Sequence, residues 1–182
     1  MSVLYLVPIG DVEESTMKAA ASCFDGVFWF DVAHLEAWEE PRFAFDQARS
    51  QYSAVAILQR LVERCPADAV RIIGITNSDL FIPMLTLVFG QAQLQGKAAV
   101  VSCARLHQEF YGLPPRPALF RARLAKEILH ETGHTFGLTH CKDPACVMSL
   151  ATGITQVDNK GSEFCKGCTA LIHERTARLN LV

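Results

Sequence analysis

The segment from His130 to His140 constrains this chain more than any other, because it reads H-E-x-x-H-x-x-G-x-x-H. Histidines four residues apart on a helix project from the same face, so His130 and His134 can bind one zinc ion together. Gly137 tolerates the positive φ of a sharp turn at a helix end, and that turn allows His140 to return as a third ligand. Three protein ligands with an open fourth position are typical of a catalytic zinc site, whereas structural zinc sites are closed.

Glu131 stands beside the first of these histidines and can reach a water at the metal. We expect it to act as the general base, which takes the proton of a zinc-activated water and later delivers it to the leaving amine. The alternative interpretation is a solvated carboxylate on a helix, which is the weaker reading beside a zinc-binding pair. The motif therefore predicts zinc-dependent hydrolysis of a peptide bond, with peptides as the partner.

A second group of candidate ligands follows the histidines: Cys141 and Cys146, then Cys165 and Cys168. Four thiolates can enclose a zinc ion tetrahedrally and leave no open position, so this site would be structural. Reduced core cysteines and disulfides are the alternatives, but the clustering and the odd total of seven cysteines favour a metal. The remaining three, Cys23, Cys65 and Cys103, are predicted to be small apolar core residues.

Composition excludes several classes of function. The chain has 182 residues and a formal net charge of −2, so no basic excess indicates nucleic acid or an anionic membrane as a partner. No apolar run approaches the ~20 residues of a membrane span. The N-terminal apolar run is short and lacks a basic lead, which favours a first strand over a signal peptide. We expect a cytoplasmic protein with a single domain over residues 1–182, its upper part spanning 1–137 and its lower part 138–182.

The order of the predicted elements indicates an α/β layer, because strands alternate with helices along the first half of the chain. Strands are predicted over 3–9, 27–33, 69–76, 85–89 and 98–102. Helices are predicted over 11–22, 46–64 and 118–135, with a last one beyond 168. Asp11 is expected to cap the first helix, and Leu171, Ile172 and Leu179 are expected to face inward from the last. Strand 85–89 is the candidate edge strand for pairing with an extended peptide.

Taken together, these motifs resemble those of the archaemetzincins, a family of metzincin-clan zinc peptidases. The matching positions are His130, Glu131, His134, Gly137, His140, Cys141, Cys146, Met148, Cys165 and Cys168. The adjacency of the third histidine and the first cysteine is distinctive of that family. Between Met148 and Cys165 lie 16 residues, one fewer than the family's spacing, and a loop absorbs such a change at little cost.

The resemblance implies a metzincin-like α/β fold, with a twisted, mixed five-stranded sheet that has one antiparallel edge strand. It also implies an active-site helix and a small C-terminal zinc-bound subdomain, with two zinc ions in all. Met148 would lie in a turn that forms an apolar floor under the histidines. Some metzincins add a tyrosine ligand beyond that methionine, but no tyrosine follows Tyr111, so the group that stabilises the oxyanion besides zinc is not identified.

Two functions are compatible with these motifs. The first is a zinc metallopeptidase acting on small or selected peptides, since no propeptide is evident to mask the zinc. The second is a zinc-stabilised binding or regulatory module with little or no turnover. Glu131 separates them, because a pure binding module has no need of a base at that position. A DNA-binding zinc module fits less well, since no basic stripe accompanies the cysteines.

Overall fold

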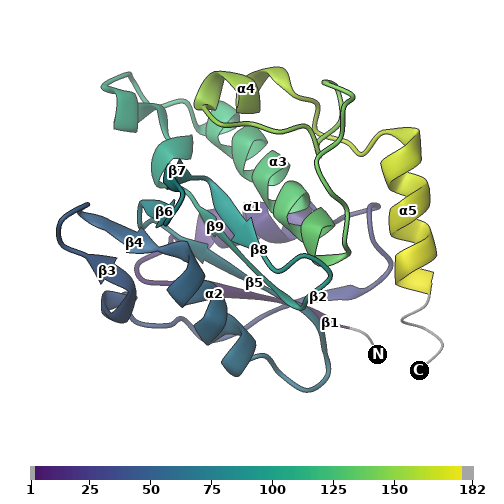
Figure 1. Ribbon diagram of the computed structural model, residues 1–182, viewed down its shortest axis with the longest axis horizontal. Coiled ribbons are helices and arrows are strands. Elements are labelled where there is room, and N and C mark those ends of the chain that lie inside the picture. Colours follow the sequence, from purple (N-terminus) through teal and green to yellow (C-terminus); the bar gives the residue numbers. More distant parts are fainter. Residues whose placement is uncertain (1–2, 178–182) are drawn as a thin grey trace.

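A five-stranded sheet forms the centre of the chain in the computed structural model, which describes residues 3–177 (Figure 1). Its strands, in spatial order, are β2 (Asp31–His34), β1 (Val3–Ile9), β5 (Ala69–Thr76), β9 (Ala98–Ser102) and β8 (Gly90–Ala92). Neighbouring strands run parallel except β8, which pairs antiparallel with β9. The predicted mixed sheet with one antiparallel edge strand is thus confirmed.

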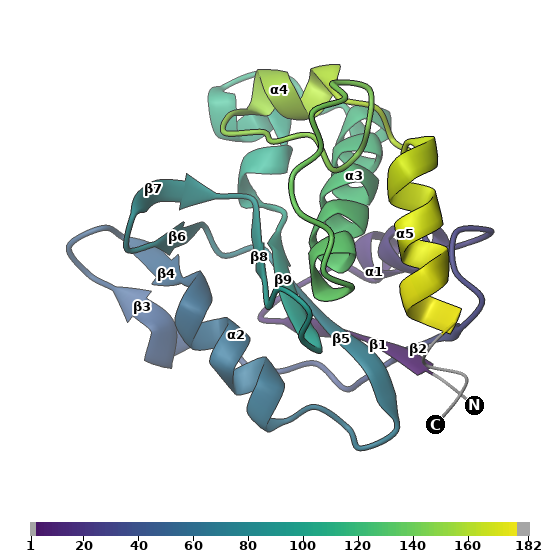
Figure 2. The ribbon, with the colours of Figure 1, turned by 45° about the vertical axis from the view of Figure 1, so that its right-hand side comes forward.

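Helices cover both faces of this sheet. The helices α1 (Glu14–Ser22) and α3 (Pro117–Thr135) pack on one face, and α2 (Ala54–Glu63) packs on the other (Figure 2). Alternate side chains of β9 therefore enter different cores: Ala99 and Val101 pack toward α1 and α3, while Ala98 and Val100 pack toward α2. Because both faces are covered, β5 is buried at every position and reads as a continuous apolar run apart from Arg71.

A second, four-stranded sheet was not predicted. It contains β3 (Phe45–Asp46), β4 (Gln51–Ser53), β6 (Leu80–Ile82) and β7 (Leu85–Val88), in that spatial order. The predicted helix 46–64 is therefore wrong in its first part, since α2 begins only at Ala54. Residues 51–53 instead pair with β6, and the Ser53 hydroxyl caps α2 by accepting a hydrogen bond from the Ala56 amide.

Two predicted strands are shorter than expected. The predicted strand 27–33 begins only at Asp31, because Phe28 and Phe30 leave the sheet direction to stack on Phe136, with ring centroids 5.5 Å and 6.0 Å away. The predicted edge strand 85–89 ends at Val88 and lies in the second sheet. The edge strand of the main sheet is β8, which follows immediately.

The predicted first helix begins late. Asp11 does not cap it, because α1 starts at Glu14 and Glu13 occupies the N-cap position, where its carbonyl accepts the first helical bonds. The Asp11 carbonyl accepts a hydrogen bond from the Asn77 side chain instead.

The C-terminal part contains two helices, α4 (Ile154–Asn159) and α5 (Lys166–Ala177). The first was not predicted, and the second starts earlier than expected, so Cys168 lies in its first turn. Ile172 is buried as predicted, whereas Leu171 is 42% exposed and that prediction was wrong. The prediction for Leu179 lies outside the described residues. Across residues 3–177, no helix combines the length and apolar character that crossing a bilayer requires.

Candidate metal centres and active-site pocket

The active-site helix α3 presents two faces. Pro117 stands at its first turn, where a missing amide proton costs nothing, and Leu124 and Ile128 form its buried side. Phe120, one turn before Leu124, is half-buried. On another face, Glu127, His130, Glu131 and His134 recur at spacings of three and four residues, and all four line one pocket.

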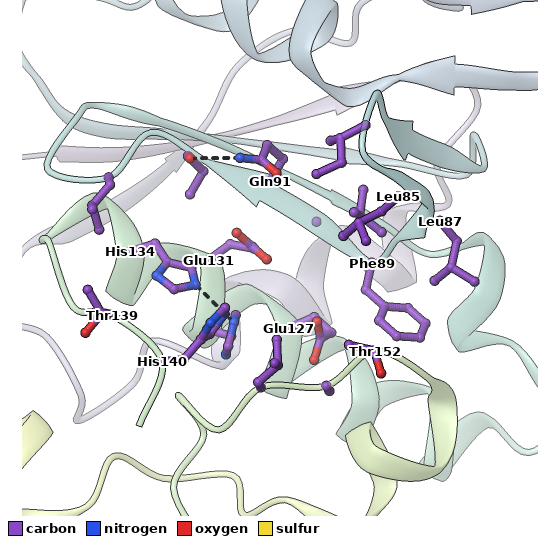
Figure 3. Close-up of a pocket in the computed structure, with 18 of the residues that line it drawn as sticks. Leu85, Leu87, Phe89, Gln91, Glu127, Glu131, His134, Thr139, His140 and Thr152 are labelled. Carbon is purple, nitrogen blue, oxygen red and sulfur yellow. Dashed lines mark hydrogen bonds between the residues drawn. The ribbon is translucent and has the colours of Figure 1, made fainter. Parts of the chain in front are cut away.

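The three predicted zinc-binding histidines come together. His130 and His134 direct their Nε2 atoms to within 3.1 Å of each other, and one ligand atom from each of the three residues lies within 4.8 Å of the others. The helix ends at Thr135, and Gly137 adopts a φ of +85°, which turns the chain back so that His140 faces the pair. Its ring centroid lies 5.3 Å from that of His130 and 5.0 Å from that of His134 (Figure 3).

Hydrogen bonds orient two of these rings for metal binding. His130 Nδ1 donates to the Val147 carbonyl at 2.9 Å, and His134 Nδ1 donates to the Leu138 carbonyl at 2.7 Å. Both Nε2 atoms are then left unprotonated, as metal ligands require. Burial lowers the pKa of His130 to about 2 and also lowers the pKa values of His134 and His140. The neutral imidazoles and their converging lone pairs fit a zinc ion.

Met148 forms a floor beneath α3, as the resemblance implied. Its side chain is fully buried, and a Cβ atom built at Gly133 would come within 2.5 Å of its Sδ atom. The Met148 carbonyl accepts a hydrogen bond from the Cys141 amide at 2.9 Å. The same turn therefore supports the helix, orients His130 through Val147, and holds the first cysteine.

Glu131 is buried in the pocket wall beside the histidines (Figure 3). Its side chain lies against Gly90 of β8, at the edge of the main sheet. Burial, together with the charge of the nearby Glu127, raises the pKa of the carboxyl to about 8, and the charge of Lys160 opposes both effects.

The four predicted cysteines also converge, with Sγ atoms within 4.8 Å of one another. Cys141 Sγ lies 3.8 Å from Cys165 Sγ, and the Cys165 amide donates to Cys146 Sγ at 3.3 Å. A backbone hydrogen bond from Cys168 lowers the pKa of Cys165 to about 7, which favours the thiolate form that binds metals. This donor set fits a closed tetrahedral zinc site.

The other cysteines and histidines stay apart from both clusters. Cys103 is buried in the core as predicted, but Cys23 and Cys65 are only half-buried. His107 stacks on Phe120 with ring centroids 3.9 Å apart, and neither His34 nor His173 joins a candidate metal cluster among the described residues.

A network of polar residues around Asp79 connects the second sheet to the main sheet. Asp79 forms a bidentate pair with Arg105 at 2.6 Å and 2.8 Å. It also accepts a hydrogen bond from Gln51, whose amide nitrogen donates to the Thr86 carbonyl as well. This network connects β4 and β7 to the segment after β9. It therefore fixes the position of β7, which lines the pocket.

The pocket itself has a volume of about 510 Å³. Strands β7 and β8 form one wall, α3 forms another, and the segment 150–152 closes the remaining side. Most of its lining is apolar, with Leu85, Leu87 and Phe89 along the strand wall (Figure 3).

Two charged residues in this pocket were missed from the sequence. Glu127 lies four residues before Glu131, so the helical spacing of the motif could have revealed it. Lys160 carries no such signal, because only the path of the chain beyond α4 brings it to the pocket.

Comparison with known proteins agrees with this geometry. The model of "Peptidase family M54" matches residues 34–174. The archaemetzincin of Methanocaldococcus jannaschii is 38% identical over 168 residues, which make up 92% of this chain and 91% of that protein. The archaemetzincin of Methanopyrus kandleri is 44% identical over 138 residues, 76% of this chain and 75% of that protein.

Solved structures show the same fold. The crystal structure of archaemetzincin from Methanopyrus kandleri aligns with a TM-score of 0.84 at 36% identity and covers 97% of this chain and 96% of that one. The structure from Archaeoglobus fulgidus, complexed with malonate, aligns with a TM-score of 0.80 at 30% identity, over 93% of this chain and 99% of that one.

Proposed function

The chain belongs to peptidase family M54, the archaemetzincin zinc metallopeptidases, and on this premise we propose that it hydrolyses peptide bonds in small or selected peptides. The observation that carries the proposal is the convergence of His130, His134 and His140 beside the buried carboxylate of Glu131 in one pocket. Histidine nitrogens without further protein ligands leave room for substrate, as a catalytic site needs.

The three histidines would hold the catalytic zinc, which would supply a Lewis acid to activate water and polarise the scissile carbonyl. Val147 and Leu138 keep two of the rings in the tautomer that offers Nε2. Glu131 accepts the proton of the attacking water and returns it to the leaving amine. Its enclosure by β8 keeps bulk water away from the carboxylate.

The substrate is an extended peptide that lies along the strand wall of the pocket. Strand β7 ends the second sheet and β8 ends the main sheet, so each has one edge without a partner strand in its own sheet. Such an edge can add a peptide strand through backbone hydrogen bonds. A pocket of about 510 Å³ accommodates only a few side chains, which supports a restricted range of peptides.

The four cysteines would hold a second, structural zinc. Their thiols crowd together as free cysteines, with Cys141 and Cys165 in contact. An oxidising compartment converts such thiols to disulfides, so the site supports action in the cytoplasm. The site also ties the segment after His140 to the start of α5, in a region with little secondary structure.

The test is metal analysis followed by cleavage of a peptide library by wild type and by the Glu131→Ala variant. We expect two zinc ions per chain in both proteins and hydrolysis only in wild type. Glu36→Ala, which removes an exposed glutamate, is the matched control and should cleave like wild type. Equal cleavage by Glu131→Ala would remove Glu131 from the mechanism. Binding of peptides without cleavage by wild type would favour the zinc-stabilised binding module instead.

A further inference from the structure

A buried ion pair lies in the wall of the active-site pocket. Lys160 Nζ is 2.8 Å from Glu127 Oε1, and the two side chains are only 2% and 4% exposed. By contrast, Lys18 and Glu14 form an ion pair on α1 whose side chains are 73% and 81% exposed. Burying two charges costs free energy that their mutual attraction seldom repays, so the Glu127–Lys160 pair calls for an explanation.

The pair lies next to the reacting groups. Glu127 precedes Glu131 by one helical turn, or about 6 Å along the axis, on the same face of α3. Figure 3 shows it between the histidine cluster and the side chains of Phe89 and Thr152. Both residues line the pocket with the small surface that they expose, so a substrate side chain adjacent to the scissile bond can approach the pair.

Lys160 does not serve to orient the metal ligand beside it. Its Nζ is 3.4 Å from His130 Nδ1, but that nitrogen donates its proton to Val147 and cannot accept one from an ammonium group. The partner of the lysine is thus Glu127. The contact is short but poorly aligned, and no donor in residues 3–177 makes a well-directed hydrogen bond to Glu127 Oε1.

Anchoring of α4 does not explain the pair either, because other contacts already join α3 to α4. Arg123 forms a bidentate pair with Asp158, both bonds measuring 2.7 Å. Lys126 Nζ donates to the carbonyl oxygens of Val157 and Asp158 at 2.9 Å each. An apolar pair of similar volume at 127 and 160 would pack this region at least as well.

We propose that Glu127 and Lys160 determine substrate specificity, and that they select an uncharged amide side chain, asparagine or glutamine, next to the scissile bond. This inference rests on the proposed peptidase function. A primary amide donates an N–H to the carboxylate and accepts one from the ammonium group at the same time. An acidic or basic side chain meets a like charge, and an aliphatic one covers both charges without hydrogen bonds.

The test measures binding in the zinc-loaded Glu131→Ala protein, so that turnover is not needed. The probe is a positional library of otherwise identical peptides that carry Gln, Leu, Lys or Glu at one position at a time. At one position, Gln should bind about tenfold or more tightly than the other three. Adding Lys160→Met should move that preference toward Lys, whereas adding Glu127→Gln should move it toward Glu, by a similar factor.

Three controls separate specificity from folding. The double variant Glu127→Gln, Lys160→Met is uncharged and should again prefer uncharged peptides, even if a single variant folds poorly. Glu14→Gln and Lys18→Met make the same substitutions in an exposed pair and should leave the preference unchanged. Equal weakening of all peptides by both pocket variants would overturn the inference. So would a preference for Leu, Lys or Glu in the Glu131→Ala protein that keeps Glu127 and Lys160.

The two proposals fail in different ways. A clear preference for Gln without any cleavage by wild type contradicts the peptidase function alone. Cleavage by wild type without a side-chain preference contradicts the specificity role of the pair alone.

Discussion

Gly90 lies directly against Glu131. A Cβ atom at position 90 would come within 2.6 Å of Glu131 Cγ and 2.8 Å of the Val100 carbonyl oxygen. Both distances are shorter than non-bonded contacts allow, and the second involves the backbone of the neighbouring strand. The edge strand β8 can therefore approach the active-site helix this closely only because residue 90 has no side chain.

Gly90→Ala should reduce kcat/KM by about 10- to 100-fold, because the added methyl group displaces the proposed base from its place beside the histidines. Zinc content should stay at the wild-type value, since the histidines are not touched. Gly153→Ala is the matched control, because a Cβ there meets nothing closer than Gln156 Oε1 at 3.8 Å. Unchanged kinetics in Gly90→Ala would show that the position of Glu131 tolerates this displacement.

Met148→Ala should lower the free energy of unfolding by about 2–5 kcal/mol, because it opens a cavity beneath α3. Met148→Leu nearly conserves the volume and should cost less than about 1.5 kcal/mol. Urea unfolding of the two zinc-loaded variants measures both values. A similar, small loss in both would mean that the floor under the histidines can collapse around a missing side chain.

Arg71→Met should lower the free energy of unfolding by about 2–3 kcal/mol, since it removes a buried cation that caps the end of the active-site helix. Arg71 donates to the hydroxyl and carbonyl oxygens of Thr135 and lies 4.0 Å from the ring centroid of Phe136. The exposed Arg64, which lies over Trp38, provides the control Arg64→Met, with an expected change of about 0.5 kcal/mol. Equal losses in the two variants would contradict the capping role.

Cys165→Ser should reduce the zinc content from two ions per chain to one and lower the melting temperature, because three thiolates no longer close a tetrahedral site. Cys65→Ser removes a half-buried cysteine outside the cluster and should keep both ions. Metal analysis by mass spectrometry and a thermal melt distinguish these outcomes. Two zinc ions in Cys165→Ser would place the second metal elsewhere.

The sequence predicted those elements in which local pattern and burial agree. The strand 69–76 and the helix 118–135 are long and strongly patterned, and both are present. The members of the histidine and cysteine clusters could also be predicted from the sequence, because metal binding restricts both the residue types and their spacing. The same helical spacing could also have predicted that Glu127 lies on the face of α3 that carries Glu131.

The remaining features depend on contacts between distant segments. The helix predicted from residue 46 gives way to strand β4 because residues 51–53 find a partner in β6, and strands of two to four residues carry too little periodicity to be recognised. Leu171 and Ile172 are neighbours, so the direction in which α5 docks decides which of them is buried. The path that brings Lys160 under His130 is likewise set by the packing of α4.

The pocket is assembled from segments that a ribosome delivers at different times. The strand wall and α3 emerge first, while the segment 150–152 and Lys160, which complete the lining, follow later, and Cys165 and Cys168 come later still. A partly synthesised chain that ends before residue 150 carries His130 and His134 together with the strand wall, but lacks the side that segment 150–152 closes. The pocket is therefore complete only after Lys160 has left the ribosome.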